Sequence, residues 1–162
     1  MKKIDKAALL QKIQAELQSQ FEILKAAALA TYEDATHEES KPENEYDTRG
    51  LEASYLAGAQ GKRLGEIEEV FAVLKFLKLR ELTPDDQIQL SAIIEVKHND
   101  KTLHIFLVPK GGGLTVPHEG LNIQVVATSS PLGESLLGLY VDDVAIVESG
   151  ARTLEYDVIA IQ

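Results

Sequence analysis

A stripe of mainly apolar residues near the N-terminus, unbroken by glycine or proline, constrains the fold more than any other feature of this sequence. The stripe consists of Leu10, Ile13, Leu17, Phe21, Leu24 and Ala28. Its members recur every three or four residues, and the pattern continues to about His37. This heptad-like spacing predicts one long helix with a single apolar face. Asp5 is expected to cap its N-terminus, with Ile4 placed to pack against Leu9.

A second stripe with the same spacing predicts a second helix. It consists of Leu56, Gln60, Leu64, Ile67, Phe71, Leu74 and Lys78. Ser40 and Glu43 fit a capping box, so this helix is expected to begin near Lys41 and to end before the break at 83–86. Two helices of roughly 33 to 38 residues joined by a short turn must be antiparallel neighbours, each about 50 to 55 Å long. The sequence therefore predicts a helical hairpin, a coiled coil, over residues 1–80.

Glycines are unusually frequent in the second predicted helix. Each of Gly50, Gly58, Gly61 and Gly65 weakens a helix by up to about 1 kcal/mol unless it serves packing. We expect them to permit close approach to an alanine-rich part of the first helix. That part contains Ala26, Ala27, Ala28 and Ala30.

After residue 84 the apolar period changes from the helical one to two, or to short apolar runs. Strands are expected at 88–96, 102–108, 121–126, 144–147 and 154–161, the first two joined as a hairpin by the turn at 98–101. A short helix is expected from Ser130 to Gly138, entered by Ser-Pro and closed by glycine. The chain is thus predicted to be α+β, with a β-rich domain over 85–162 and a boundary near 80–86.

Charge and composition narrow the classes of partner. The 162 residues include 26 acidic and 16 basic side chains, a formal net charge of -10. Such a surface argues against nonspecific binding to a phosphate backbone and favours a basic protein surface or pore as the partner. The absence of cysteine excludes disulfides and thiolate zinc sites and suits the cytoplasm. No apolar run is long enough to span a membrane, so no membrane partner is expected. The protein is further expected to be a cytoplasmic monomer.

Three C-terminal stretches carry a resemblance to a known family. They are Ser130–Gly138 with the sequence SPLGESLLG, Val141–Val144 with VDDV, and Leu154–Ile159 with LEYDVI. Together they resemble the C-terminal signature of the Gre transcript-cleavage factors, the GreA/GreB family, whose second domain is FKBP-like. Asp142 stands where that signature usually has glycine. The stretch 43–46, ENEY, is similar to the family's tip motif Glu-Asn-Ala-Glu-Tyr with one residue missing.

The resemblance implies a transcription elongation factor that binds RNA polymerase at the secondary channel and stimulates cleavage of backtracked RNA. Such a factor is not an enzyme itself, because the polymerase performs the hydrolysis. It has no cofactor of its own, and its partners are RNA polymerase and the RNA 3′ end. The resemblance also implies DNA binding and a role in regulating DNA-templated transcription elongation. The residues expected to dock on the polymerase are Pro131, Leu132, Leu136, Leu137, Asp142 and Asp143.

In the Gre family two carboxylates at the hairpin tip share the polymerase's Mg²⁺, a hard cation that prefers oxygen ligands. Alignment on the Glu-Asn pair places them at Glu43 and Ser40, whereas alignment on the tyrosine places them at Glu39 and Pro42. The candidate tip residues are therefore Glu39 and Glu43, with Glu38 beside them. Without the resemblance, an acidic hairpin end of this kind is usually just solvated.

Other readings of the sequence remain open or are disfavoured. Because one expected tip carboxylate is displaced, a noncleaving or inhibitory secondary-channel regulator is an alternative. A plain coiled-coil interaction module, whose β-rich domain binds some other protein, is an alternative from a different class. A prolyl isomerase is disfavoured, since the only aromatic side chains of the β-rich domain are Phe106, Tyr140 and Tyr156. The four histidines lack metal-ligand spacing.

Overall fold

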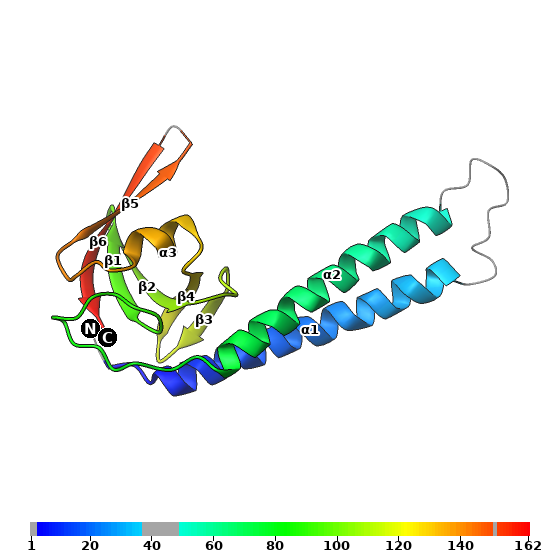
Figure 1. Cartoon of the computed structure of the whole chain (residues 1–162), viewed down its shortest axis with the longest axis horizontal. Coiled ribbons are helices and arrows are strands. Elements are labelled where there is room, and N and C mark those ends of the chain that lie inside the picture. The colour runs from blue at the N-terminus through cyan, green and yellow to red at the C-terminus, as the bar shows by residue number, and fades with distance from the viewer. Residues whose placement is uncertain (1–2, 37–48, 151) are drawn as a thin grey trace. The chain divides into compact units, whose positions relative to one another are not determined.

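The computed structural model describes residues 3–36, 49–150 and 152–162 (Figure 1). In chain order the elements are α1 (Lys6–Thr36), α2 (Arg49–Lys75), β1 (Ile93–His98), β2 (Lys101–Val108), β3 (Thr115–His118), β4 (Leu121–Ala127), α3 (Pro131–Leu136), β5 (Val144–Ser149) and β6 (Arg152–Ile161). The predicted α+β class is confirmed. The chain divides into two compact units, which we call the sheet unit (residues 1–14 and 72–162) and the hairpin unit (residues 15–71).

The sheet unit contains one six-stranded sheet with the order β3-β4-β2-β1-β6-β5. Neighbouring strands are antiparallel except β2 and β4, which pair in parallel from His104↔Ile123 to Val108↔Ala127. The predicted hairpin of β1 and β2 is confirmed, with its turn at Asn99 in the left-handed region (φ 53°). A register shift between Glu95 and Val96 interrupts the pairing of β1 with β6.

The central strands are buried on both faces, as consecutive buried residues in β2 show. One face forms a core with α3, in which Leu136 joins Val96, Ile105 and Val158. Phe106 is also completely buried and lies on the opposite face, because successive side chains of a strand alternate. The sheet unit is therefore a two-sided core and not a sheet with one solvated face.

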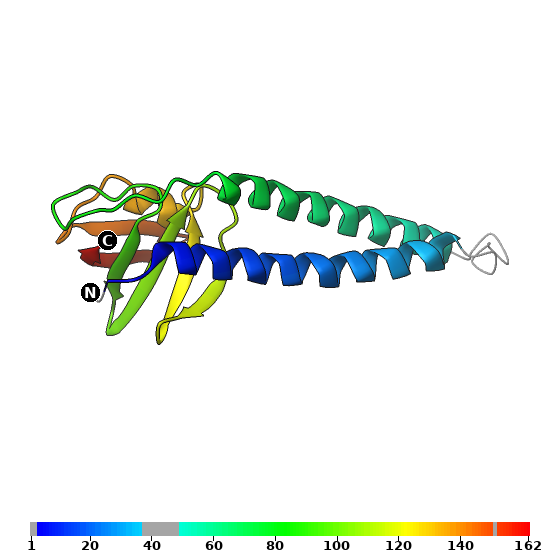
Figure 2. The same cartoon turned by 90° about the horizontal axis from the view of Figure 1, so that it is seen from below.

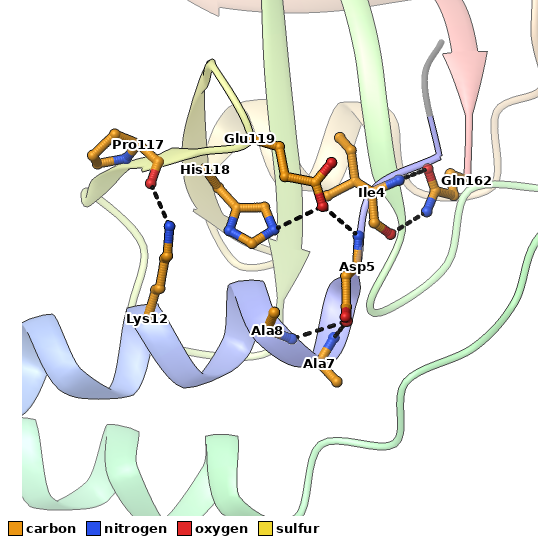
Figure 3. Close-up of polar contacts among 9 residues, drawn as sticks. All are labelled: Ile4, Asp5, Ala7, Ala8, Lys12, Pro117, His118, Glu119 and Gln162. Carbon is orange, nitrogen blue, oxygen red and sulfur yellow. Dashed lines mark hydrogen bonds and ion pairs between the residues drawn. The ribbon is translucent and has the colours of Figure 1, made fainter.

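The N-terminal turns of α1 belong to the sheet unit and are tied to it by hydrogen bonds (Figure 3). The Asp5 carboxylate accepts from the backbone N–H of Ala7 at 2.9 Å and of Ala8 at 3.0 Å, which confirms the predicted N-cap. The Gln162 side chain accepts from the Ile4 N–H at 2.9 Å and donates to the Ile4 carbonyl at 2.5 Å. Ile4 and Leu9 are both buried, as the predicted staple requires. The two ends of the chain therefore stabilise each other.

Lys6, in the first turn of α1, is the one buried lysine or arginine among the described residues. It is 4% exposed, and its Nζ donates to the Arg80 carbonyl at 2.5 Å. Burial lowers the pKa of Lys6 from 10.5 to about 8, although the nearby Glu81 carboxylate raises it. Folding therefore makes protonation of Lys6 less favourable than in the unfolded chain, although a pKa of about 8 keeps the charged form predominant at pH 7.

The helices differ from the prediction in three respects. Lys78 is not part of α2, because the helix tightens at its end, where Leu77 N–H bonds to the Leu74 carbonyl at 3.3 Å. Leu56, assigned to the apolar stripe, is 53% exposed. The close approach predicted for Gly58, Gly61 and Gly65 is wrong, since a Cβ built on any of them would meet no atom within 4 Å. The same prediction for Gly50 falls outside the residues whose surroundings the structure describes. The predicted start near Lys41, with its capping box, lies outside the described residues.

The strands also differ from the prediction. β1 begins at Ile93 instead of Ile88, because a loop with Ser91 at φ 68° precedes it. Ile88 is nevertheless buried, and its N–H bonds to the Leu139 carbonyl at 2.8 Å. β3 was not predicted, and it is short and contains Pro117. β5 and β6 are longer than expected, because their strands pair up to Ser149↔Arg152.

Candidate functional site

The predicted tip carboxylates Glu38, Glu39 and Glu43 lie outside the described residues, as do Ser40 and Pro42. Their roles stay predictions. Within the described ranges, no group of three or more acidic, histidine or cysteine side chains could hold a metal ion. No described helix is long and apolar enough to cross a membrane.

The hairpin unit presents the apolar stripes of α1 and α2 to each other. Phe21 and Gln18 of α1 line a small pocket together with Phe71 and Glu68 of α2. The middle of α1 thus faces a late turn of α2, as an antiparallel pair permits (Figure 2). Burial in this unit is nevertheless slight, since Ile23 is 69% exposed.

The first stretch of the C-terminal resemblance forms α3 and its caps. Ser130 is the N-cap residue, and its Oγ accepts from the Gly133 N–H at 3.1 Å. The same hydroxyl donates to the Ala127 carbonyl at 2.8 Å. Pro131 occupies the first turn, where its missing N–H costs nothing. The Ser-Pro start of the sequence motif therefore serves helix initiation.

Gly133 is required by close packing. A Cβ at this position would lie 2.0 Å from the Ala127 carbonyl oxygen, a backbone atom that cannot move aside cheaply. The glycine thus lets α3 rest directly on the end of β4. Leu136, one turn further along α3, is completely buried in the core.

The segment after α3 is a tight connection into β5. Gly138 has φ 81°, and its N–H bonds to the Ile88 carbonyl at 2.9 Å. Asp142 has φ 71°, in the left-handed region that favours glycine and that aspartate tolerates better than most residues. The Asp143 carboxylate accepts from the Tyr140 N–H at 2.8 Å. Asp142 therefore occupies a position whose backbone suits the glycine that the resembled signature has there.

The structure divides the six predicted docking residues between surface and core. Pro131, Leu137 and Asp142 are exposed, and Leu132 and Asp143 are half-buried. The prediction that Leu136 docks on a partner is wrong. Leu136 is 0% exposed, because it lies on the same helix face as Leu132 and points into the core.

Tyr140 is a surface residue that lies within the segment predicted to dock, from Leu132 to Asp143, but is not among the six named docking residues. It is 46% exposed and lies between the exposed Leu137 and Asp142. Exposed aromatic side chains are enriched at protein interfaces. That signal could have found it in the sequence. A groove of about 520 Å³ lies beside the start of α3, and Leu132 lines it together with Leu114 and Val126.

Comparison with known proteins gives structural neighbours at low sequence identity. No protein-family model matches the chain, and no curated protein sequence matches it. GreA factor homolog 1 (Gfh1) of Thermus thermophilus is 18% identical over 92% of this chain and 94% of that one, with a TM-score of 0.39. Gfh1 of Thermus aquaticus is 22% identical over 91% and 92%, with a TM-score of 0.39.

A prokaryotic transcription elongation factor GreA/GreB from Nitrosomonas europaea is 18% identical over 59% of this chain and 78% of that one, with a TM-score of 0.37. All these identities are below 25% and all these TM-scores are below 0.5. The similarities are therefore too low to assign the chain to a family or to give it an activity.

Proposed function

We propose that this protein is a transcription factor that binds RNA polymerase at the secondary channel. In this proposal the surface around α3 and the connection to β5 docks on the polymerase, and the hairpin carries acidic side chains toward the catalytic Mg²⁺. The output is stimulated cleavage of backtracked RNA. The protein acts on the hydrolytic activity of the polymerase and has no cofactor of its own.

The observation that supports docking is the packing of the three signature-like stretches against one another. Leu136 from the first stretch packs in one core with Val158 from the third, and Val141 and Tyr156 pack against that core. Asp142 and Asp143 bond to Val158 through the backbone, at 2.9 Å and 2.8 Å. Segments that are separate in the sequence thus pack into one part of the sheet unit. Leu137 and Tyr140 remain exposed beside it.

The chemistry assigned to the hairpin tip rests on the sequence. Mg²⁺ at a phosphoryl-transfer site takes oxygen ligands, and carboxylates supplied transiently can hold the ion and orient a water. Glu39 and Glu43 are the residues we propose for this, with Glu38 beside them. The acidic composition of the chain suits entry into a basic pore.

The test is RNA cleavage in purified backtracked elongation complexes with Mg²⁺. The full chain is compared with Glu39→Ala, Glu43→Ala and the double variant, and Glu66→Ala serves as the control because Glu66 is an exposed carboxylate on α2. We expect stimulation by the wild type and by Glu66→Ala, and its loss in the double variant. Unchanged cleavage with the wild type would contradict the proposed output.

A noncleaving regulator is the second candidate function, and the displaced tip carboxylate favours it. Under this alternative the protein suppresses cleavage while it competes with a GreA/GreB factor for the channel. Binding itself is tested by co-purification with core RNA polymerase. Consistent absence of the polymerase subunits would favour a coiled-coil interaction module instead.

A further inference from the structure

β5 is an edge strand with apolar side chains on its exposed face. It pairs only with β6 at the end of the sheet order. Ala145 and Val147 point into the core, whereas Val144 is 43% and Ile146 is 57% exposed. Exposed apolar edge strands are templates for pairing with another chain, and soluble proteins usually protect them.

The backbone of β5 has hydrogen-bonding groups directed away from β6. Ser149 and Arg152 close the hairpin, and Val158 N–H bonds to the Asp143 carbonyl at the other end, at 2.8 Å. Antiparallel pairing alternates, so the residues between them that face β6 are Ala145 and Val147. The backbone N–H and C=O groups of Val144, Ile146 and Glu148 therefore point away from β6, toward the open edge of the sheet. Among the described residues, no backbone hydrogen bond joins β5 to any segment other than the one that contains β6.

The opposite edge of the same sheet is protected. β3 has four residues, and one of them is Pro117, which has no N–H to offer. The Pro117 carbonyl accepts from the Lys12 Nζ of α1 at 3.4 Å (Figure 3). β5 has neither a proline nor a lysine. The two edges of the sheet therefore differ. Pro117 and Lys12 hinder pairing at β3, whereas β5 has neither kind of residue and leaves its outward backbone groups open to another strand.

The acidic residues near β5 determine which kind of partner segment can pair with its open edge. The segment 134–157 contains six acidic residues and one basic residue, Arg152. The acidic residues are Glu134, Asp142, Asp143, Glu148, Glu155 and Asp157. A second copy of this chain would bring the same acidic groups into contact, and such contacts repel. A basic partner segment would be attracted.

We infer that the β5 edge binds an extended segment of a partner protein in which apolar residues alternate with lysine or arginine. The segment adds a strand to the sheet through the backbone of Val144, Ile146 and Glu148. Its apolar side chains cover Val144 and Ile146. Because side chains alternate along a strand, its basic side chains point to the opposite face of the sheet, where α3 packs beside β5 and carries the exposed Glu134. This interaction surface goes beyond the proposed function and does not depend on it.

Three seven-residue peptides with blocked termini test the inference on the full chain. The first alternates lysine and valine, the second has the same residues with proline in place of the central valine, and the third has glutamate in place of lysine. Binding is measured by titration, and amide exchange is measured by NMR at Val144, Ile146 and Glu148. We expect the first peptide to bind and to slow exchange at these amides, and the other two to bind at least about tenfold more weakly.

Variants of the chain separate strand addition from simple charge attraction. Ile146→Pro removes an outward N–H while leaving the pairing with β6 intact, and Ile146→Lys places a like charge on the surface. Both should weaken the first peptide by about tenfold or more. Ile23→Lys is the matched control, because Ile23 is an exposed isoleucine on α1, and it should leave affinity unchanged. Amide exchange of the buried strands β1 and β2 shows whether each variant is folded.

Several results would overturn the inference. Equal binding of the proline peptide, or unchanged affinity of a folded Ile146→Lys variant, would exclude strand addition at β5. Equal binding of the glutamate peptide would exclude the basic partner. Concentration-dependent dimerisation that Ile146→Lys abolishes would make a second copy the occupant instead.

Discussion

The sheet unit and the hairpin unit bury their apolar side chains to very different extents. The largest fully buried side chains among the described residues, such as Phe106, Ile93 and Leu74, all lie in the sheet unit. In the described part of the hairpin unit the buried apolar residues are Leu17 and Val70, at 5% and 8% exposure. Tyr55, in the same unit, is 83% exposed.

This difference indicates that the two units are stabilised by different terms. The sheet unit depends on the removal of apolar surface from water, which is worth about 25 cal/mol per Å². The hairpin unit depends more on hydrogen bonds within each helix and on helix propensity, which are small per residue. Segments with few buried contacts open at lower free energy than the core. We therefore expect amide exchange to be faster in the hairpin unit than in β1 and β2.

The largest expected effect comes from removing a buried leucine from the sheet unit. Leu107→Ala should lower the free energy of unfolding by about 3 kcal/mol or more, because it leaves a cavity in the core. The matched control is Leu29→Ala on α1, where the side chain is 58% exposed and alanine is a good helix former. Its effect should stay within about 0.5 kcal/mol. Equal losses in denaturant unfolding would remove the distinction between the units.

The next effect is a pH dependence of the sheet unit from Lys6. Its pKa is lowered to about 8 in the folded chain, from 10.5. Between these pH values the unfolded chain binds more protons, so stability rises as pH rises through this window. The wild type should gain up to about 3 kcal/mol relative to Lys6→Met between pH 7.5 and 10.5.

The measurement for Lys6 is denaturant unfolding at both pH values. Lys25→Met is the control, because Lys25 is an exposed lysine on α1 in the hairpin unit. The difference between wild type and Lys25→Met should not change in the same direction over this range. A constant difference between wild type and Lys6→Met would mean that Lys6 is solvated in the folded chain.

Much of the fold could be predicted because local pattern and final environment agree. The helical period of α1, its Asp5 cap and the Ser-Pro start of α3 are local features, and the structure has all three. The short apolar run of β2 and the alternation in β6 are also local. The neighbours of each element were harder to predict. The sequence could not show whether Gly58, Gly61 and Gly65 face another helix or open space, and the structure has open space there.

Features set by tertiary contacts were the ones missed. The loop before β1, residues 88–92, alternates apolar and polar residues as a strand would, but hydrogen bonds of Ile88 to Leu139 and Gly138 keep it out of β1. The parallel pairing of β2 with β4 depends on chain topology and leaves no local signal. The resemblance identified the segment that is expected to dock. It did not distinguish exposed from buried residues, and the helical period is what places Leu136 in the core. The tip residues Glu38, Glu39 and Glu43 stay predictions.

A smaller effect, with opposite signs in the two units, is expected for glycine-to-alanine changes. Gly58→Ala, Gly61→Ala and Gly65→Ala should each stabilise α2 by about 0.5 to 1 kcal/mol, because nothing lies near the added Cβ. Gly133→Ala should destabilise the sheet unit, since its Cβ would meet Ala127 O at 2.0 Å. Amide exchange in α2 measures the first group, and global unfolding measures Gly133→Ala. Destabilisation by the α2 changes would restore the close helix packing predicted from the sequence.

The smallest effect concerns a cap inside the well-packed sheet unit. Ser130→Ala removes the hydroxyl that accepts from Gly133 N–H at 3.1 Å, so it should cost about 1 kcal/mol of unfolding free energy. Ser129→Ala is the control, because Ser129 is an exposed neighbour outside the cap, and its effect should be near zero. If the two variants unfold alike, α3 is held by Leu136 in the core and by the tight fit of Gly133 alone. Packing, and not the capping hydrogen bond, would then determine stability even at the end of a helix in the sheet unit.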